Sequence, residues 1–328
     1  MKLATLKSAE RDGQLVVVSE DLSRAVAVPD LARNLQQALD SWAACAAGLE
    51  NVYRQLNQGG MTGSFAFNQA DCHSPLPRAF MWCEASAWLS HMERCRKASG
   101  RVLPESFYTE PAIHEGGSDT QQAPHDPMLA FDDSWDLDLE AGVCVITDDV
   151  PMGASEQECA QHIKLVCLVN DFSLRAIQIP EMAKGMGALQ GKPARAYSPV
   201  VVTPETLGTA WKNHMLAADL EVHVNEQPLG NLRPDQDGVF NFPQIIKHIA
   251  RTRAIATGSI IGAGTVSNRN DSAGYGCLYE KRSMEVLCAG EAKTSWLKFG
   301  DTVKIEAKSN NKSIFGSIFQ KVERVLTS

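Results

Sequence analysis

Carboxylates in three separate segments are the residues of this chain that point most clearly to chemistry. Glu84 lies in FMWCEASAWLSHMERC, Asp138 and Glu140 lie in WDLDLEAGVCVI, and Asp171 lies in LVCLVNDFSLRAIQ. Two of these segments place the acid directly against an apolar run typical of a buried strand. A carboxylate in such a place costs free energy unless it is paired or bound to a cation. If folding brings the segments together, they form a cation site with oxygen ligands only.

The acidic pair in the second segment also has a simpler interpretation. In DLDLE, acidic residues alternate with Leu137 and Leu139. On a strand, Asp136, Asp138 and Glu140 would share one face, which could simply be a solvated face. Like charges on one face repel each other, however, and this favours a counter-ion.

Glu84 and His91 are seven residues apart, which is about two turns of a helix. We therefore predict a helix that carries both on one face, with Trp88 between them. The alternative is an ordinary amphipathic helix with a surface glutamate and a hydrogen-bonded histidine.

Three further residues have ordinary interpretations when each is taken alone. Asp171 follows an apolar run that reads as a helix, so it could be a turn residue. Lys192 in QGKP would ordinarily be a surface lysine, and Glu280 in GYGCLYEKRS an edge charge.

Composition narrows the class of protein. The chain has 328 residues and a net charge of −8, with an isoelectric point near 5.5. It has no basic stripe, so we expect no nucleic-acid partner. Its nine cysteines show no CxxC pairing and read as reduced core residues of a cytoplasmic protein. The sequence shows no signal peptide and no apolar run near the roughly 18 residues that span a membrane, so we expect no membrane association.

Turn-forming residues divide the chain near residue 75. Residues 1–75 are expected to form a small N-terminal domain, and residues 76–328 a catalytic domain. In the first part we predict strands at 2–7, 14–19 and 24–28 and a helix over 30–57.

The second part reads mostly as short strands. They are predicted at 143–148, 197–203, 218–224, 258–262, 284–288 and 302–306. Helices are predicted over 155–172, where Ser155 and Glu158 form a capping-box pattern, and over 240–255. The GAGT at 262–265 lacks the strand–helix context of a dinucleotide-binding loop.

Several motifs in a fixed order resemble those of the fumarylacetoacetate hydrolase (fumarylacetoacetase) family in its long bacterial form. They are DLEAGVCVI, NDFSLRAIQ followed by QGKPARAYSPVVVTP, and GAGTVS followed by YGCLYE. The resemblance covers roughly residues 75–325. It implies an α+β, β-rich fold: a small N-terminal β-domain and a C-terminal mixed β-roll or sandwich.

The resemblance also implies a metal site. The family's metal carboxylates fall on Glu84, Asp138, Glu140 and Asp171. The family usually has Asp at the position of Glu84 and Glu at the position of Asp138. Each exchange keeps the negative charge. Oxygen ligands of this kind favour Mg²⁺ or Ca²⁺, with Mn²⁺ as a third option.

By the same resemblance, His91 is the catalytic base, with Glu280 as its partner. Lys192 and Gln178 would hold the oxyanion. The substrate contacts fall on Thr265, Tyr108 and Arg175.

The departures from the family pattern concern the substrate. Met182 stands where fumarylacetoacetases have a tyrosine, and the motif ARD becomes Leu174-Arg175-Ala176. The arginine expected nine residues after the histidine has no exact match. Candidates nearby are Arg94, Arg96 and Arg101, and the aromatic residue of the next loop could be Phe107 or Tyr108.

The activity implied by the resemblance is metal-dependent hydrolysis of a carbon–carbon bond in a β-diketo acid. The first candidate substrate is fumarylacetoacetate, cleaved to fumarate and acetoacetate in tyrosine catabolism. The alternative is a 2-oxo acid decarboxylase, hydratase or isomerase of the same family, acting on oxaloacetate or a fumarylpyruvate-type substrate. A non-enzymatic metal-binding protein is a third hypothesis. We expect a small dicarboxylic or diketo acid as the partner molecule, and a homodimer because the family usually forms one.

Overall fold

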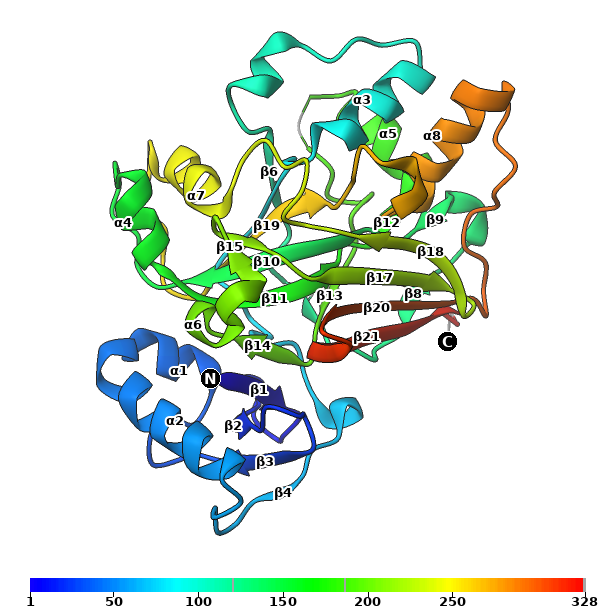
Figure 1. The fold of residues 1–328 in the computed structure, drawn as a ribbon. Coiled ribbons are helices and arrows are strands. Elements are labelled where there is room, and N and C mark those ends of the chain that lie inside the picture. The colour runs from blue at the N-terminus through cyan, green and yellow to red at the C-terminus, as the bar shows by residue number, and fades with distance from the viewer. Residues whose placement is uncertain (120, 186, 327–328) are drawn as a thin grey trace.

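The computed structural model describes residues 1–119, 121–185 and 187–326, and its main sheet runs through the whole molecule (Figure 1). The chain begins with a meander, as the sequence predicts. Its strands are β1 (Lys2–Leu6), β2 (Gln14–Val18), β3 (Arg24–Ala27) and β4 (Phe65–Ala66). The helix predicted over 30–57 is present as two helices, α1 (Leu35–Asp40) and α2 (Trp42–Asn57), because the chain bends at Ser41.

The N-terminal meander is joined to the rest of the molecule by strand pairing. Strand β1 lies antiparallel to β14 (Val200–Val202), with Leu3 opposite Val201. From there the sheet continues through β11 (Ile163–Asn170), β10 (Ala141–Thr147), β19 (Ser259–Thr265), β5 (Trp82–Ala85) and β6 (Ile113–Gly116). The predicted boundary near residue 75 therefore falls within a molecule whose two parts share one sheet.

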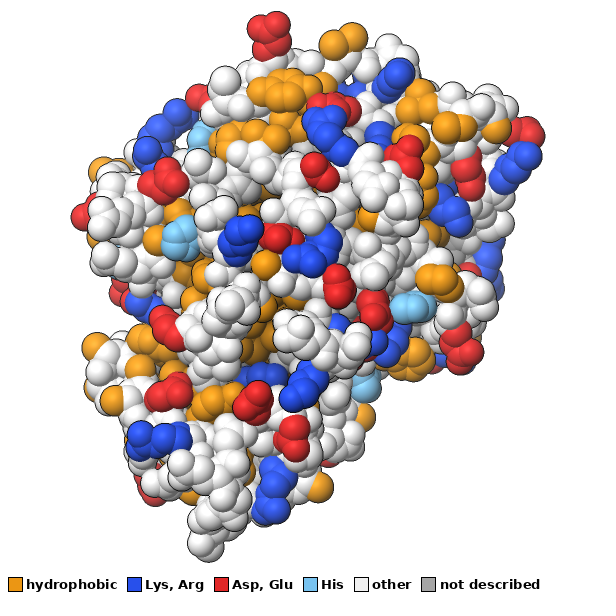
Figure 2. All heavy atoms as spheres, in the orientation of Figure 1, with side chains coloured by type: hydrophobic (Ala, Val, Ile, Leu, Met, Phe, Trp, Pro, Cys, Tyr) orange, Lys and Arg blue, Asp and Glu red, His pale blue; other side chains and the backbone are white. Residues whose placement is uncertain are grey.

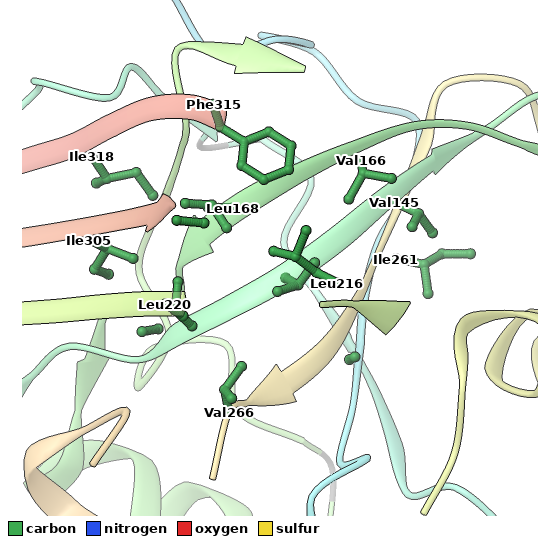
Figure 3. Close-up of a cluster of buried hydrophobic side chains, with 14 of the residues drawn as sticks. Val145, Val166, Leu168, Leu216, Leu220, Ile261, Val266, Ile305, Phe315 and Ile318 are labelled. Atoms are coloured by element: carbon green, nitrogen blue, oxygen red, sulfur yellow. The ribbon is translucent and has the colours of Figure 1, made fainter. Parts of the chain in front are cut away.

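A second sheet covers one face of the first. Its strands are, in order, β18 (Gln227–Leu232), β17 (Asp219–Val224), β20 (Thr302–Ser309), β21 (Lys312–Arg324) and β8 (Met128–Ala130). Side chains from both sheets meet in the core between them. Figure 3 shows Leu168 from the first sheet beside Ile305, Phe315 and Ile318 from the second. Because β10 and β11 are buried on both faces, their sequences are almost continuously apolar.

Helices gather at the two ends of the main sheet. Helices α3 (Leu89–Ala98), α5 (Arg175–Met182) and α8 (Leu278–Ala289) lie at one end, and α4 (Glu156–Gln161) and α7 (Phe242–Ala250) at the other (Figure 1). The remaining short elements are β7 (Gln121–Gln122), β9 (Leu137–Asp138), β12 (Ser173–Leu174), β13 (Arg195–Tyr197), α6 (Pro204–Leu207), β15 (Trp211–Lys212) and β16 (Met215–Leu216).

Three local predictions are wrong. The helix over 155–172 ends after α4, and the apolar run that follows it is β11; the capping box at Ser155 marks a real helix start but not its length. The strand predicted at 284–288 is part of α8. Glu84 lies on β5 and the helix begins only at Leu89, so Glu84 and His91 do not share a helix face.

The surface is mixed in charge. On the face shown in Figure 2, acidic and basic side chains are interspersed. Within the described residues, no helix is long and apolar enough to cross a membrane.

Candidate active site

Strand pairing in the main sheet brings three of the predicted carboxylates together. Ala141 pairs with Asn170 across β10 and β11, so Glu140 just before one strand and Asp171 just after the other lie at the same edge. Strand β5 lies parallel to β19 and places Glu84 opposite Gly262. All three carboxylates are buried.

Glu140 is held by several donors. Its Oε1 lies 2.7 Å from the Ser173 hydroxyl and 2.8 Å from Lys192 Nζ, and its Oε2 accepts a 2.7 Å hydrogen bond from Thr265. Arg175 Nη2 lies 2.7 Å from Oε1. Burial alone would raise the pKa of Glu140, but the charges of Arg175 and Lys192 hold it well below its usual value.

Asp171 shares Lys192 with Glu140. Lys192 Nζ lies 2.5 Å from Asp171 Oδ2. Burial would lower the pKa of Lys192, but Asp171 and Glu140 raise it, so the buried lysine stays charged. The second oxygen, Asp171 Oδ1, has no hydrogen-bond partner among the described residues, although Arg195 Nε lies 3.5 Å away.

Glu84 faces Asp171 and a histidine that our sequence reasoning missed. His114 on β6 pairs with Glu84 across the strands, and side-chain atoms of Glu84, His114 and Asp171 lie within 4.8 Å of one another. Burial first, and Asp171 second, raises the pKa of Glu84 well above its usual value. His114 Nε2 has no partner among the described residues. No motif in the sequence marks His114; only the β5–β6 pairing brings it here.

This set of groups fits a divalent cation. Glu84, Glu140 and Asp171 supply buried oxygen ligands, and Asp171 Oδ1 and His114 Nε2 are buried polar atoms without partners in the described chain. A polar group buried without a partner is costly, and a bound cation would remove that cost for the oxygen ligands.

Asp138 lies next to these residues, but both of its carboxylate oxygens already accept hydrogen bonds from other groups. Its Oδ2 accepts hydrogen bonds from Arg175 Nε and Nη2 at 2.9 and 2.7 Å and from the Tyr279 amide at 3.1 Å. Its Oδ1 accepts one from the Leu278 amide at 2.8 Å. Asp138 thus fixes Arg175 and the start of α8. Its assignment as a metal ligand stays a prediction, which requires Arg175 to release an oxygen.

The predicted histidine–glutamate pair is formed between α3 and α8. His91 Nδ1 lies 3.0 Å from Glu280 Oε2. The other oxygen, Oε1, accepts hydrogen bonds from Arg94 at 2.6 Å and Ser267 at 2.7 Å. Burial alone would raise the pKa of Glu280, but its hydrogen bonds with His91, Ser267 and Arg94 lower it. An ionised Glu280 makes Nδ1 the protonated ring nitrogen and leaves Nε2 as the basic atom.

Two thiols beside His91 affect its protonation. Burial lowers the pKa of His91, whereas Cys95 and Cys277 would, as thiolates, raise it well above its usual value. Burial raises the pKa of Cys277 to about 12, so this thiol is protonated near neutral pH and its contribution is then absent.

His91 and several of the groups around the carboxylates line one cavity of about 480 Å³. The buried residues of its lining include Glu84, Glu140, Gln178, Lys192 and Thr265. Partly or fully exposed residues mark its outer part, and these include Arg96, Arg101, Phe107 and Met182. Arg175 also lines it, and Arg175 Nη1 donates a 2.9 Å hydrogen bond to Gln178 Oε1.

Tyr108 is placed differently from its neighbour Phe107. Its hydroxyl donates a 2.7 Å hydrogen bond to Glu93, and the residue is 46% exposed. Of the two aromatic candidates, Phe107 is the one that contributes to the cavity wall in the described structure, and Tyr108 lies on the surface.

The fold and this site define a class of β-rich enzymes whose carboxylate-lined pocket lies at the end of a mixed sheet. Residues 1–78 match the family described as fumarylacetoacetase N-terminal domain 2, and residues 81–323 match the fumarylacetoacetate hydrolase C-terminal family. The chain belongs to the fumarylacetoacetate hydrolase family, whose members include hydrolases and isomerases.

Solved structures share the fold along the whole chain. A putative HpcE protein from Mycobacterium smegmatis has a TM-score of 0.71 at 17% identity, covering 99% of this chain and 100% of its own. A probable 2-hydroxyhepta-2,4-diene-1,7-dioate isomerase from Mycobacterium abscessus scores 0.68 at 15% identity, with both chains covered fully. Maleylpyruvate hydrolase from Sphingobium sp. SYK-6, solved with manganese(II) and pyruvate, scores 0.65 at 15% identity over 99% and 100%. At such identities the likeness shows the fold alone. No curated protein matches the sequence.

Proposed function

We propose that this protein hydrolyses a carbon–carbon bond of a β-diketo acid with the help of a divalent cation. The observation that carries the proposal is the pair of His91 with the buried Glu280, because His91 lines the same cavity as Glu84 and Glu140. An oriented base beside a cation site is what activation of water next to a chelated dicarbonyl requires.

Glu84, Glu140 and Asp171 would hold the cation, with Mg²⁺, Ca²⁺ or Mn²⁺ as candidates. When bound, the cation would act as a Lewis acid on the dicarbonyl oxygens. That a maleylpyruvate hydrolase was solved with manganese(II) supports the choice of Mn²⁺ as the first metal to test.

His91 would take a proton from water through Nε2, and Glu280 would stabilise the resulting imidazolium from the Nδ1 side. The water oxygen adds to the acyl carbon. The carbon–carbon bond then breaks, the new acid keeps the water oxygen, and the departing carbon takes up the proton. Water supplies all the added atoms, so no other reactant is consumed.

Gln178 and Lys192 would donate hydrogen bonds to the oxyanion. Gln178 Oε1 accepts from Arg175, so its amide NH₂ is the end that can face the substrate. Lys192 is less free, because its Nζ already contacts Asp171 and Glu140. Of the two, Gln178 is therefore the better placed to stabilise the oxyanion in this structure.

The outer cavity supports a substrate with a second carboxylate. Arg101 and Arg96 line this end, and the Arg96 guanidinium lies 5.1 Å from the centre of the Phe107 ring. Two cations above an apolar wall suit an extended dicarboxylic acid. Fumarylacetoacetate, the tyrosine-derived substrate, meets this description, and so do acylpyruvates such as fumarylpyruvate.

A substrate panel tests the proposal. Purified protein is assayed with fumarylacetoacetate, fumarylpyruvate and oxaloacetate, each with Mg²⁺, with Mn²⁺ and after chelation. We expect cleavage of at least one diketo acid, and loss of that activity on chelation. Turnover of oxaloacetate alone, or isomerisation without cleavage, would instead support a decarboxylase or isomerase.

A further inference from the structure

Two cysteines flank the His91–Glu280 pair and have no part in the proposed reaction. Cys277 Sγ lies 4.0 Å from His91 Nδ1, and Cys95 Sγ lies 3.9 Å from the same atom. Both residues are buried. Cys277 is also the N-cap of α8, where its sulfur accepts a 3.4 Å hydrogen bond from the Glu280 amide.

The side chains around Nδ1 form a set of ligands that differs from the carboxylate site. His91, Cys277 and Glu280 offer a nitrogen, a sulfur and an oxygen, all within 4.8 Å of one another. This mixture is typical of zinc, whereas Mg²⁺ and Ca²⁺ prefer oxygen. In a tetrahedral zinc site the ligand atoms are roughly 3.3–3.6 Å apart, given metal–ligand bonds of about 2.0–2.3 Å. The observed separations of 3.0 and 4.0 Å from His91 Nδ1 lie on either side of that range.

Glu280 can serve as a ligand through Oε2 without giving up its hydrogen bonds with Arg94 and Ser267. Arg94 and Ser267 both bind Oε1, and His91 faces Oε2. The oxygen that faces His91 is therefore separate from the one that the arginine neutralises.

His91 connects this set of ligands with the substrate cavity. It contributes to the cavity wall, as does Cys95. A cation in the cavity can therefore reach the set at His91. Cys95 and Cys277 are both free cysteines.

We propose that His91, Cys277 and Glu280 form a second metal site, selective for a thiophilic divalent cation such as Zn²⁺, whose occupation switches the enzyme off. Binding releases the thiol proton of Cys277 to solvent and forms a metal–thiolate bond, with no change of oxidation state. The proton on His91 Nδ1 moves to Nε2, which frees Nδ1 for the metal and leaves no basic nitrogen on the ring. A cation on Nδ1 separates the imidazole from Glu280, so His91 can no longer hold the proton taken from water. The carboxylate site and this thiol site thus have opposite effects on activity.

Cobalt titration tests the binding without relying on the proposed reaction. Co²⁺ replaces Zn²⁺ as a spectroscopic probe and is added to the reduced full-length protein in excess Mg²⁺. We compare Cys277→Ser, which retains a polar N-cap, with Cys288→Ser, which removes the exposed cysteine of the same helix. We expect one equivalent of thiolate-to-cobalt absorption in the wild type and in Cys288→Ser, and none in Cys277→Ser. An undiminished signal in Cys277→Ser, or no signal in the wild type, would overturn the site.

The inhibitory effect rests on the proposed function and is measured separately. With excess Mg²⁺ present, the Zn²⁺ concentration that inhibits the wild type should be at least tenfold lower than the concentration that inhibits Cys277→Ser. If no diketo acid is cleaved, the cobalt result still decides whether the site exists. If Cys277→Ser fails to fold, alkylation of the wild type takes its place: Zn²⁺ should slow labelling of Cys277 at least tenfold relative to Cys288, and equal rates would refute the proposal.

Discussion

At the scale of single residues, neighbouring carboxylates in this site have different tasks. Asp171 keeps one oxygen without a hydrogen-bond partner among the described residues, whereas both oxygens of Asp138 are taken by Arg175 and backbone amides. Sequence patterns cannot separate the two, because both acids lie beside buried strands. The difference comes from Arg175, 37 residues from Asp138, and from the start of α8, where Leu278 is 140 residues from Asp138.

Exchanging each aspartate for asparagine tests this difference. Asp171→Asn should lower Mn²⁺ affinity by more than about 100-fold, because it removes a charged oxygen ligand. Asp138→Asn should lower it by less than about tenfold, since its carboxylate is engaged with Arg175. Isothermal titration calorimetry measures both. Equal losses would place Asp138 among the ligands, as the family resemblance implies.

Substitution of His91 tests its proposed role as the general base. His91→Gln should lower kcat by roughly 10²–10⁴, the usual contribution of a positioned general base. Mn²⁺ affinity should stay within about threefold, because His91 is not among the carboxylate ligands. His162→Gln is the matched control: this histidine lies 2.6 Å from Asp148 and should leave kcat unchanged. Wild-type turnover by His91→Gln would remove His91 from the mechanism.

The sequence identified seven of the residues that line the cavity but missed others. The seven are Glu84, His91, Glu140, Arg175, Gln178, Lys192 and Thr265. His114 was missed because only the pairing of β5 with β6 places it opposite Glu84. Tyr108 was chosen over Phe107, and the structure places Phe107 in the cavity wall. Adjacent aromatic residues in a loop have no periodicity that would tell them apart.

At the scale of elements, glycines in the strands decide how closely the site packs. Gly264 on β19 has a φ of +97°, and a Cβ there would lie 2.4 Å from the Ala85 carbonyl oxygen, next to Glu84. The motif GAGT therefore serves close strand packing beside the site. The sequence showed that it was not a dinucleotide loop but did not show this role.

Gly264→Ala tests that packing. It should destabilise the protein by roughly 2–4 kcal/mol, from the positive φ and the backbone clash together. Gly300→Ala is the control, because Gly300 has a φ of +96° and open space around it in the described structure. It should cost only roughly 1–2 kcal/mol. Urea unfolding of both variants gives the comparison, and equal losses would contradict the close packing.

Strand β1 carries a buried lysine that should make stability depend on pH. Burial lowers the pKa of Lys2 from 10.5 to about 8. The unfolded chain binds this proton more tightly, so the contribution of Lys2 to stability falls as pH drops from about 10.5 to 8. The total is about 3 kcal/mol, from 1.36 kcal/mol per pKa unit.

Lys2→Met removes this dependence. The variant should be more stable than the wild type at pH 7 by up to about 3 kcal/mol, and the difference should shrink towards zero near pH 10.5. Measuring the difference between the two proteins cancels the opposing titration of buried thiols and tyrosines. A difference that stays constant from pH 7 to 10.5 would show that Lys2 keeps its ordinary pKa.

At the scale of the whole molecule, one sheet connects the N-terminal meander with the strands of the candidate site. The family resemblance led to the fold class, which the structure and the family matches bear out. The sequence could not predict the β1–β14 pairing, because Leu3 and Val201 are almost two hundred residues apart and Val201 lies in the uniformly apolar run Val200–Val202. Such runs fit many registers equally well, so only the complete fold selects one.

We propose that the whole molecule acts as a metal-dependent hydrolase. The decisive measurement is turnover of a diketo acid in ¹⁸O-labelled water, followed by mass spectrometry of the products. We predict two shorter products, with one ¹⁸O in the new carboxylate of the acyl fragment, and no products after chelation. An uncleaved carbon skeleton, release of carbon dioxide, or full turnover without a metal would contradict the account.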